Sequence, residues 1–224
     1  MNNTATKGGA IQIDCSLTRQ CANTITNCTF TDNSAGIQGG AINYNMNPPV
    51  MSLNNFNNNS AVYGDNIASY PVKIVQADSG DSNIHIEGAA SGLKHTDTLS
   101  FEIIDFEGQV VNNENKDTVK IASSTSEVSL SGTNFAKINN GTIEFDNLVF
   151  IAQAGQTNVK YSVSSSAINS EILSLTVPNS SLAQYSTSLN LSFRKCKPGE
   201  YENSAQQCVE CSPGTYSVEW DSKE

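Results

Sequence analysis

The sequence has 224 residues, enough for one large domain or for two smaller ones with an appendage. Only 15% of the residues are charged and the formal net charge is −10, so the clustered Lys and Arg of a nucleic-acid interface are missing and no nucleic-acid partner is expected. No segment approaches the roughly 18–20 apolar residues that cross a bilayer. Any membrane tether is therefore expected outside this segment, and both ends are interpreted as cuts in a longer protein.

The first 70 residues hold about half of all the Asn but only five charged side chains. A short motif recurs in them, in which Asn-x-Ala leads into Gly-Gly-Ala-Ile. The copies begin at Asn3, Asn33 and Asn59. The spacing is 31 residues from Gly9 to Gly40 and 25 residues from Gly40 to Asp65. A period of about 20–50 residues with short β-type segments indicates a solenoid, with a Gly/Asn-rich loop region as the alternative.

Each predicted coil brings equivalent side chains into line with those of the next coil. The repeating Asn residues can then stack as a ladder, each amide bonding to the coils above and below. The Gly pairs allow the positive φ that sharp corners need. Phe30 and Phe56 each stand three residues before a repeating Asn, which is a second match in register. Because Pro71 cannot donate to a ladder, the third copy is expected to close the solenoid.

The combined pattern, Phe-x-x-Asn-x-Ala followed by Gly-Gly-Ala-Ile, resembles the repeat of the polymorphic outer membrane protein family. The resemblance implies that residues 1–71 form a right-handed parallel β-helix, the C-terminal coils of a longer solenoid. Two copies fit the family pattern well. The third departs from it, because Asp65 replaces the second Gly.

Residues 72–193 alternate apolar and polar positions between frequent turn signals, which predicts an all-β sandwich. Candidate strands are Val72–Val75, Asn83–Glu87, Leu99–Ile104, Val110–Val111, Val119–Ile121, Val128–Leu130, Thr142–Phe145, Leu148–Ala152, Val159–Val163, Ile172–Val177 and Leu189–Phe193. Short strands over roughly 100–120 residues favour an immunoglobulin-like arrangement. Because this unit has neither Cys nor Trp, it resembles the disulfide-free bacterial or filamin-type members of that group.

Residues 194–224 carry three of the six cysteines, in the pattern Cys-x-Pro-Gly-x-Tyr followed by Cys-x-x-Cys-x-Pro-Gly-Thr-Tyr-Ser. This pattern resembles the start of an ephrin-receptor-like cysteine-rich module. The resemblance implies that Cys196 pairs with Cys208 and that Cys211 pairs with a cysteine further on. The order of the three units is similar to that of large surface proteins of ciliated protists, which implies an extracellular or cell-surface location.

The other three cysteines are also candidates for disulfide bonds. Cys15 and Cys21 bracket a short loop that a disulfide can close, whereas Cys28 faces a neighbouring coil or stays buried and reduced. Six cysteines permit fifteen pairings, so the connectivity is left open. Binding of zinc is the rival role for Cys208 and Cys211, but the sequence has no second Cys-x-x-Cys pair to complete such a site. Disulfides are favoured, and with them an oxidising compartment.

Asn-x-Ser/Thr sequons mark candidate glycosylation sites. They begin at Asn2, Asn27, Asn58, Asn140, Asn179 and Asn190. Their number is about what this Asn-, Ser- and Thr-rich composition produces by chance, so it carries no weight for secretion. If the chain is secreted, Asn140 is the best candidate because it lies at a predicted turn.

An active site is not expected. Glycoside hydrolysis needs two converging carboxylates, and lyase chemistry needs clustered acids around Ca²⁺. The predicted solenoid offers only Asp14, Asp32 and Asp65, spread over three coils, and Asp32 and Asp65 are more simply turn residues. Two His residues do not make a metal cluster. No catalytic residue, metal or cofactor is therefore assigned.

The leading hypothesis is a non-catalytic structural or adhesive segment that contacts other protein chains or copies of itself and assembles into filaments. The absence of a cap before the first copy favours further coils or end-to-end assembly. The alternative is a carbohydrate-binding module on the solenoid face, with glycans as partners of Tyr44, Tyr63 and Tyr70. A polysaccharide-cleaving enzyme is the third hypothesis.

Overall fold

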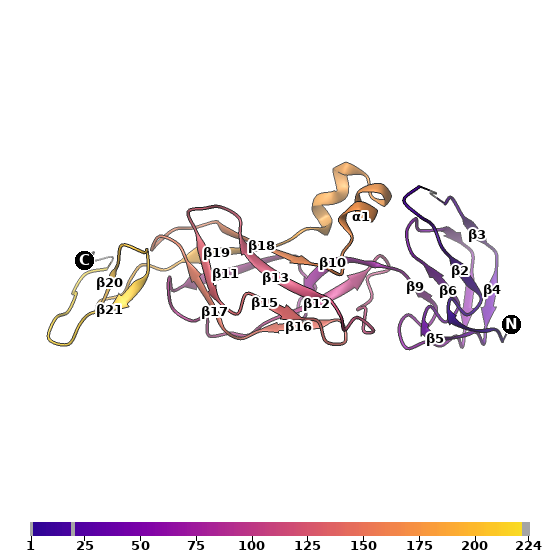
Figure 1. Cartoon of the computed structure of the whole chain (residues 1–224), viewed down its shortest axis with the longest axis horizontal. Helices are drawn as coiled ribbons and strands as arrows, with labels where there is room; N and C mark the ends of the chain where they lie inside the picture. Colours follow the sequence, from indigo (N-terminus) through magenta and orange to yellow (C-terminus); the bar gives the residue numbers. More distant parts are fainter. Residues whose placement is uncertain (1, 19–20, 221–224) are drawn as a thin grey trace.

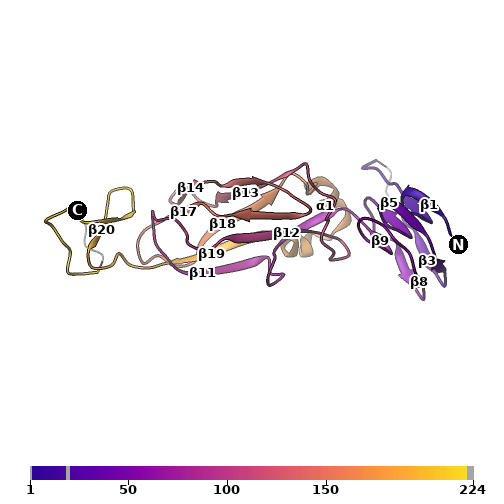
Figure 2. The ribbon, with the colours of Figure 1, turned by 90° about the horizontal axis from the view of Figure 1, so that it is seen from below.

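A computed structural model describes residues 2–18 and 21–220 of the chain. Three parts lie in series along the longest axis (Figure 1). Stacked coils lie at the N-terminal end, a two-layer β-sandwich lies in the middle and a small hairpin module lies at the C-terminal end, and the same order is clear from below (Figure 2). The fold is all-β, as predicted. Among the described residues the helical elements are two short ones, α1 and η1.

The coil segment consists of the nine strands that precede β10. They are β1 (Thr4–Lys7), β2 (Ile11–Ile13), β3 (Thr24–Thr26), β4 (Thr29–Thr31), β5 (Ser34–Gln38), β6 (Ile42–Tyr44), β7 (Val50–Ser52), β8 (Asn55–Asn57) and β9 (Ile67–Ala68). Every ladder in this segment is parallel and joins one coil to the next: β1 to β5, β2 to β6, β3 to β7, β4 to β8 and β6 to β9. Stacked coils with parallel ladders are the pairing that a solenoid requires.

The register of these ladders follows the sequence repeat. Ile11 pairs with Ile42, and Ile42 pairs with Ile67, at the same two spacings that separate the Gly-Gly positions. The inward side chains of successive coils stack into a single core, in which Phe30 and Phe56 lie 5.1 Å apart between ring centroids. Since no coil can bury its apolar face alone, stacking of equivalent residues holds the segment together.

Ten strands form the sandwich, together with the two helices. The strands are β10 (Pro71–Gln76), β11 (Asn83–Ala89), β12 (Leu99–Asp105), β13 (Thr118–Ser123), β14 (Ser129–Gly132), β15 (Phe135–Lys137), β16 (Thr142–Phe145), β17 (Leu148–Ile151), β18 (Val159–Ser165) and β19 (Thr187–Phe193). One sheet has the order β10-β12-β16 and the other β11-β19-β18-β13-β15, while β14 pairs with β17. Within the five-stranded sheet only the β11–β19 pair is parallel.

The core of the sandwich lies between the two sheets. Burial alternates strictly along β12 and β19, so one face of each sheet is apolar and packs inward. Phe101 and Phe145 of one sheet meet edge to face, with ring centroids 6.0 Å apart, and Phe150 packs against Tyr161 of the other sheet at 5.0 Å. The alternating pattern in the sequence thus predicted the inward faces correctly.

Two details of the predicted strands were wrong. Residues predicted as the strand Ile172–Val177 form the helix α1 (Ser170–Thr176), followed by η1 (Asn179–Tyr185). Asn169 caps α1 by accepting hydrogen bonds from two backbone N–H groups, and Leu173 and Val177, one helical turn apart, pack on Val72. The residues Val110–Val111 form no strand; only an isolated bridge joins Val110 to the end of β12. The short edge strand β15 was not predicted.

The C-terminal module is a hairpin of β20 (Glu200–Glu202) and β21 (Cys208–Glu210). Hydrogen bonds to Ser91 are among the contacts that fasten it to the end of the sandwich. The Ser91 hydroxyl donates to the Gln206 carbonyl at 2.6 Å, and the Cys208 N–H donates to the Ser91 carbonyl at 2.9 Å. Ser91 is fully buried, so the module continues directly from the sandwich.

Candidate functional site

The repeating asparagines form the predicted ladder. The Asn3 side-chain amide donates to Asn33 Oδ1 at 2.9 Å, and the Asn33 amide donates to Asn59 Oδ1 at 2.9 Å. The backbone N–H groups of Asn3 and Asn33 donate to the same two oxygens. Asn33 is 1% exposed, so its polar atoms depend on these partners rather than on water. The prediction of an asparagine ladder is confirmed.

The Gly-Gly positions are points of close approach between coils. A methyl group on Gly9 would overlap the Gly40 carbonyl oxygen, and one on Gly40 would overlap the Asp65 carbonyl oxygen. The preceding residue, Gly39, has a φ of 67°, the positive value predicted for a corner. Glycine is therefore needed at both positions of the pair, for conformation at the first and for space at the second.

The last coil meets the sandwich through a buried carboxylate. Asp105, at the end of β12, is 1% exposed, and its Oδ2 accepts hydrogen bonds from the Tyr63 hydroxyl and from the Ser69 N–H. Its Oδ1 accepts from the N–H groups of Glu107 and Gln109, both at 2.9 Å. With four donors around it, the buried charge is well compensated.

Further contacts complete this joint. The Tyr44 hydroxyl donates to Glu107, and the Gln109 side chain donates to the Ile67 carbonyl at 2.9 Å. Burial, reinforced by the nearby carboxylate of Glu107, raises the pKa of Tyr44 well above its usual value, so this hydroxyl stays a donor. Because the joint combines directional bonds with the aromatic contact of Tyr70 and Phe106, it fixes the sandwich against the last coil.

The three tyrosines predicted as a sugar platform do not form one. Tyr44 is fully buried and Tyr63 is 3% exposed, and both hydroxyls bond to carboxylates of the sandwich. Tyr70 is half-buried, and its hydroxyl lies 2.8 Å from the Thr176 hydroxyl. All three rings therefore take part in the joint, and of the three only Tyr70 keeps appreciable exposed surface.

A cleft of about 950 Å³ lies beside the joint, between the coil face and the loop that follows β12. Its lining includes the amide side chains Gln12, Gln38, Asn43, Asn45 and Asn113. The coil residues Gln12 and Asn43 were not predicted as site residues, although they occupy the same position in two copies, three residues after the second Gly. That register was the available signal. Nothing in the sequence placed Asn113 against them, since that contact depends on the joint.

The acids of the coil segment have separate local roles. The Gln12 amide donates to Asp14 at 2.7 Å, the Asn58 amide donates to Asp32 at 2.5 Å, and Asp65 accepts the Ala61 N–H at 3.1 Å. Asp32 has a φ of 54°, as suits a turn residue. These acids lie on different coils and do not converge, so the arrangement offers no carboxylate pair.

The cysteine candidates fall into two groups. The structure joins Cys15 to Cys21 and Cys196 to Cys208, and leaves Cys28 and Cys211, both half-buried, outside disulfides. The Cys28 thiol lies 3.4 Å from the Thr26 carbonyl oxygen.

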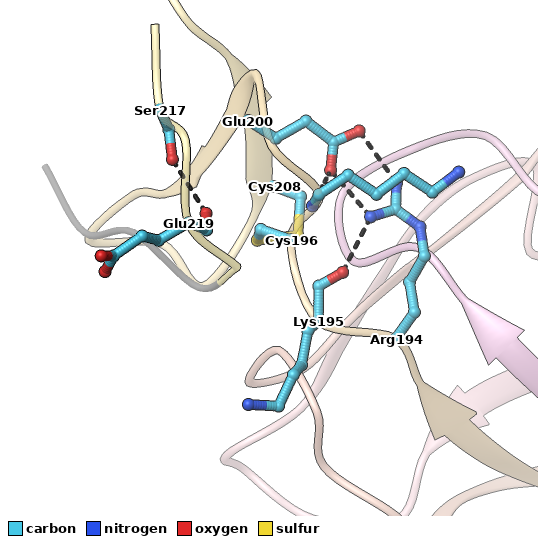
Figure 3. Close-up of polar contacts among 8 residues, drawn as sticks. Arg194, Lys195, Cys196, Glu200, Cys208, Ser217 and Glu219 are labelled. Carbon is cyan, nitrogen blue, oxygen red and sulfur yellow. Dashed lines mark hydrogen bonds and ion pairs between the residues drawn. A yellow bond between two sulfur atoms is a disulfide. The ribbon is translucent and has the colours of Figure 1, made fainter.

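Figure 3 shows the Cys196–Cys208 bridge beside an ion pair that holds the hairpin to the end of β19. Arg194 donates from both terminal nitrogens to Glu200, at 2.7 and 2.9 Å. These hydrogen bonds lower the pKa of the Glu200 carboxyl. Glu200 and the two sulfurs lie within 4.8 Å of one another, but a disulfide offers no thiolate to a metal ion.

The candidate glycosylation sites within the described residues differ in accessibility. Asn27, Asn58, Asn140 and Asn179 are exposed, whereas Asn190 is half-buried and its amide donates to Asn83. Asn140 has a φ of 50° at the turn before β16, the place that the sequence predicted. Glycosylation of any of them stays a prediction.

Comparison with known families bears on one stretch of the coils. Residues 27–44 match the model of the Chlamydia polymorphic membrane protein repeat. This stretch contains the stacked Phe30, the ladder residue Asn33 and the close-packed Gly40. Residues 27–44 are thus similar to a polymorphic membrane protein (Pmp) repeat. No curated protein matches the chain significantly.

The stretch similar to this repeat contains β4, β5 and β6, so it supplies one strand to each of three parallel sheets. The residues that define the motif are thus the residues that hold one coil on the next. No helix within residues 2–18 and 21–220 has the length and apolarity needed to span a bilayer.

Proposed function

We propose that this chain is a non-catalytic structural and adhesive segment of an extracellular or cell-surface protein. The observation that carries the proposal is the serial arrangement of stacked coils, buried polar joint and sandwich along one axis. Such a chain acts as a stiff spacer, because each part is bonded to the next over several directional contacts. The separation of the coil acids, each bonded locally, supports a role without catalysis.

The surface location rests on two supports. The Pmp-like repeat belongs by similarity to a family of membrane proteins, which favours an outer-membrane or surface position. The two disulfides favour an oxidising compartment, since cytosolic thiols are kept reduced. Exposed sequons such as Asn140 are consistent with a glycoprotein in such a compartment.

The proposed domains are a right-handed parallel β-helix over residues 1–71, an immunoglobulin-like sandwich over residues 72–193 and the start of an ephrin-receptor-like module over residues 194–224. The strand order β11-β19-β18-β13-β15 opposite β10-β12-β16, with one parallel pair at the edge, supports the immunoglobulin-like assignment. The Cys196–Cys208 bridge supports the third assignment. From this order of units we propose that the protein is a large surface protein of the ciliate type.

The proposed partners are other protein chains or copies of this one. Within the described residues, β1 and β2 each pair with one strand only, so their other edges offer backbone donors and acceptors. An unpaired strand edge is a template for a further strand. Contact at this edge would extend the stack into filaments.

The proposal is tested with beads that carry the purified chain. Coated beads are mixed with each other and with cells of the source organism, and beads carrying the reduced and alkylated chain are the control. The proposal expects bead–bead or bead–cell attachment that the control loses. Attachment to neither, or release of sugar from a panel of polysaccharides by the chain, would overturn it.

A further inference from the structure

We propose that the cleft beside the joint binds a neutral oligosaccharide. The cleft has a volume of about 950 Å³, the size of a small-molecule site, and it lies between two structural units, where such sites are common. This inference goes beyond the structural role proposed above and rests on separate observations: a chain of amides, balanced charge and a half-exposed apolar wall.

Four amides and one carboxylate form a continuous hydrogen-bonded chain along the cleft. Asn113 of the sandwich donates to Gln38 at 3.1 Å, and Gln38 donates to Asn43 at 2.7 Å. Asn43 donates in turn to Gln12 at 2.9 Å, and Gln12 donates to Asp14 at 2.7 Å. Because every bond runs in the same direction, the chain fixes the plane and the orientation of each amide.

The fixed amides have hydrogen-bonding capacity to spare. A carboxamide has two N–H donors and two acceptor lone pairs, and each inner member of the chain uses one of each within it. Gln12 is exposed and Gln38 is half-buried, so their remaining donors and acceptors face the cleft. A ligand whose groups both donate and accept satisfies them best, and a hydroxyl is such a group.

The charge of the lining selects against ions. Two lysines and two acids line the cleft: Lys7, Lys116, Asp14 and Glu114. Asp14 already accepts from Gln12, and Glu114 accepts from two backbone N–H groups. Because the lining has no net charge, it favours neither a phosphate nor a cation. It favours a neutral compound with several hydroxyl groups.

The remaining lining suits the C–H face of a sugar ring. Ile37 is 39% exposed, and Tyr70 and Pro71, which also line the cleft, are half-buried. Apolar and aromatic surface next to orienting polar groups is the usual composition of a ligand pocket. The Asp105 joint holds the two walls in place, so the cleft is preformed and binding orders little of the chain.

The test uses the intact chain and an array of neutral and acidic oligosaccharides, followed by calorimetric titration of the best neutral ligand. Gln12→Ala and Gln38→Ala are expected to weaken binding about tenfold each, as the loss of one or two hydrogen bonds implies. Gln184→Ala, an exposed amide on η1, is the matched control and is expected to bind as the parent does.

The Gln12 side chain is exposed, so Gln12→Ala is expected to leave the unfolding midpoint unchanged. An unchanged midpoint shows that weaker binding is not caused by a folding defect. Three results would overturn the proposal. They are no neutral ligand on the array, binding that survives both cleft substitutions, and binding of acidic glycans alone that Lys7→Ala abolishes.

Discussion

Single residues decide how one coil rests on the next. Asn33 is buried and joins the coils on both sides of it through its amide, while Gly40 leaves space for a carbonyl of the following coil. The role of Asn33 followed from the sequence alone. For the Gly pair the sequence predicted the positive φ that Gly39 has, but not the close approach at Gly40. The roles of Gln38 and Asn113 did not follow from the sequence, because their contact depends on how the sandwich docks.

Replacing the middle rung of the asparagine ladder tests the first of these roles. Asn33→Ala removes the acceptor of Asn3 and one of the two donors to Asn59 Oδ1, which keeps only the backbone N–H of residue 33. We therefore expect a loss of about 2–3 kcal/mol in the free energy of unfolding. Urea denaturation followed by circular dichroism measures it. Asn57→Ala, at an exposed strand position, is the control and should change stability by no more than about 0.5 kcal/mol. Equal effects of the two substitutions would show that the ladder adds nothing.

The space at the second Gly of the pair is tested by adding one methyl group. Gly40→Ala would press a methyl group into the Asp65 carbonyl, and we expect it to destabilise the chain by about 1–3 kcal/mol. At Gly36 the nearest atom to an added methyl is 3.9 Å away, so Gly36→Ala should be neutral or slightly stabilising. Thermal unfolding compares the two. An unharmed Gly40→Ala protein would refute the close approach of the coils.

At the scale of elements, periodicity predicted the strands better than the helices. The alternation in Leu99–Asp105 and Thr187–Phe193 places one face of each strand in the core, and the observed strands follow it. The segment Ile172–Val177 is at least as apolar as these strands, but the Asn169 cap and the contact of Leu173 with Val177 make it helical. Short apolar runs do not distinguish the two states without such a cap.

The joint between coils and sandwich depends on Asp105, the last residue of β12. Nothing in the sequence indicated this role. Asp105→Asn places a donor where the Tyr63 hydroxyl or backbone N–H groups already donate, so we expect a loss of about 3 kcal/mol. Hydrogen exchange should rise at Ser69, or at Glu107 and Gln109, depending on which of these N–H groups then faces the amide nitrogen. Asp146→Asn, at an exposed position, is the control. Unchanged exchange at all three positions would mean that the carboxylate does not hold the joint.

The ion pair between Arg194 and Glu200 predicts a dependence on pH. Hydrogen bonds from Arg194 lower the pKa of Glu200 below its ordinary 4.5, so the folded state binds this proton more weakly than the unfolded state. The pair therefore stabilises above about pH 4.5, and its contribution is lost as the pH falls through the lowered pKa.

Glu200→Gln removes this contribution. We expect it to destabilise the hairpin by no more than about 1 kcal/mol at pH 7, since the pair is close to solvent. The difference from the parent should shrink at pH 3, as measured by proteolysis of the module. A difference that stays constant from pH 7 to pH 3 would rule out a contribution from the charged pair.

For the whole molecule, composition and repeats predicted an all-β chain of several units, and the structure bears out the all-β class. The sequence could not predict how the coils and the sandwich are arranged relative to each other. Their joint is made by side chains far apart in the sequence, such as Tyr44 and Glu107. The cleft beside the joint is a consequence of the same docking. Local patterns therefore predicted the parts, and long-range contacts determined their assembly.

The most direct test of the surface role is antibody labelling of the source cells, intact and permeabilised. Antibodies raised against the purified chain should label intact cells, and brief treatment of those cells with an external protease should remove the label. Labelling that needs permeabilisation, together with protection from the protease, would contradict an extracellular or cell-surface role for this chain.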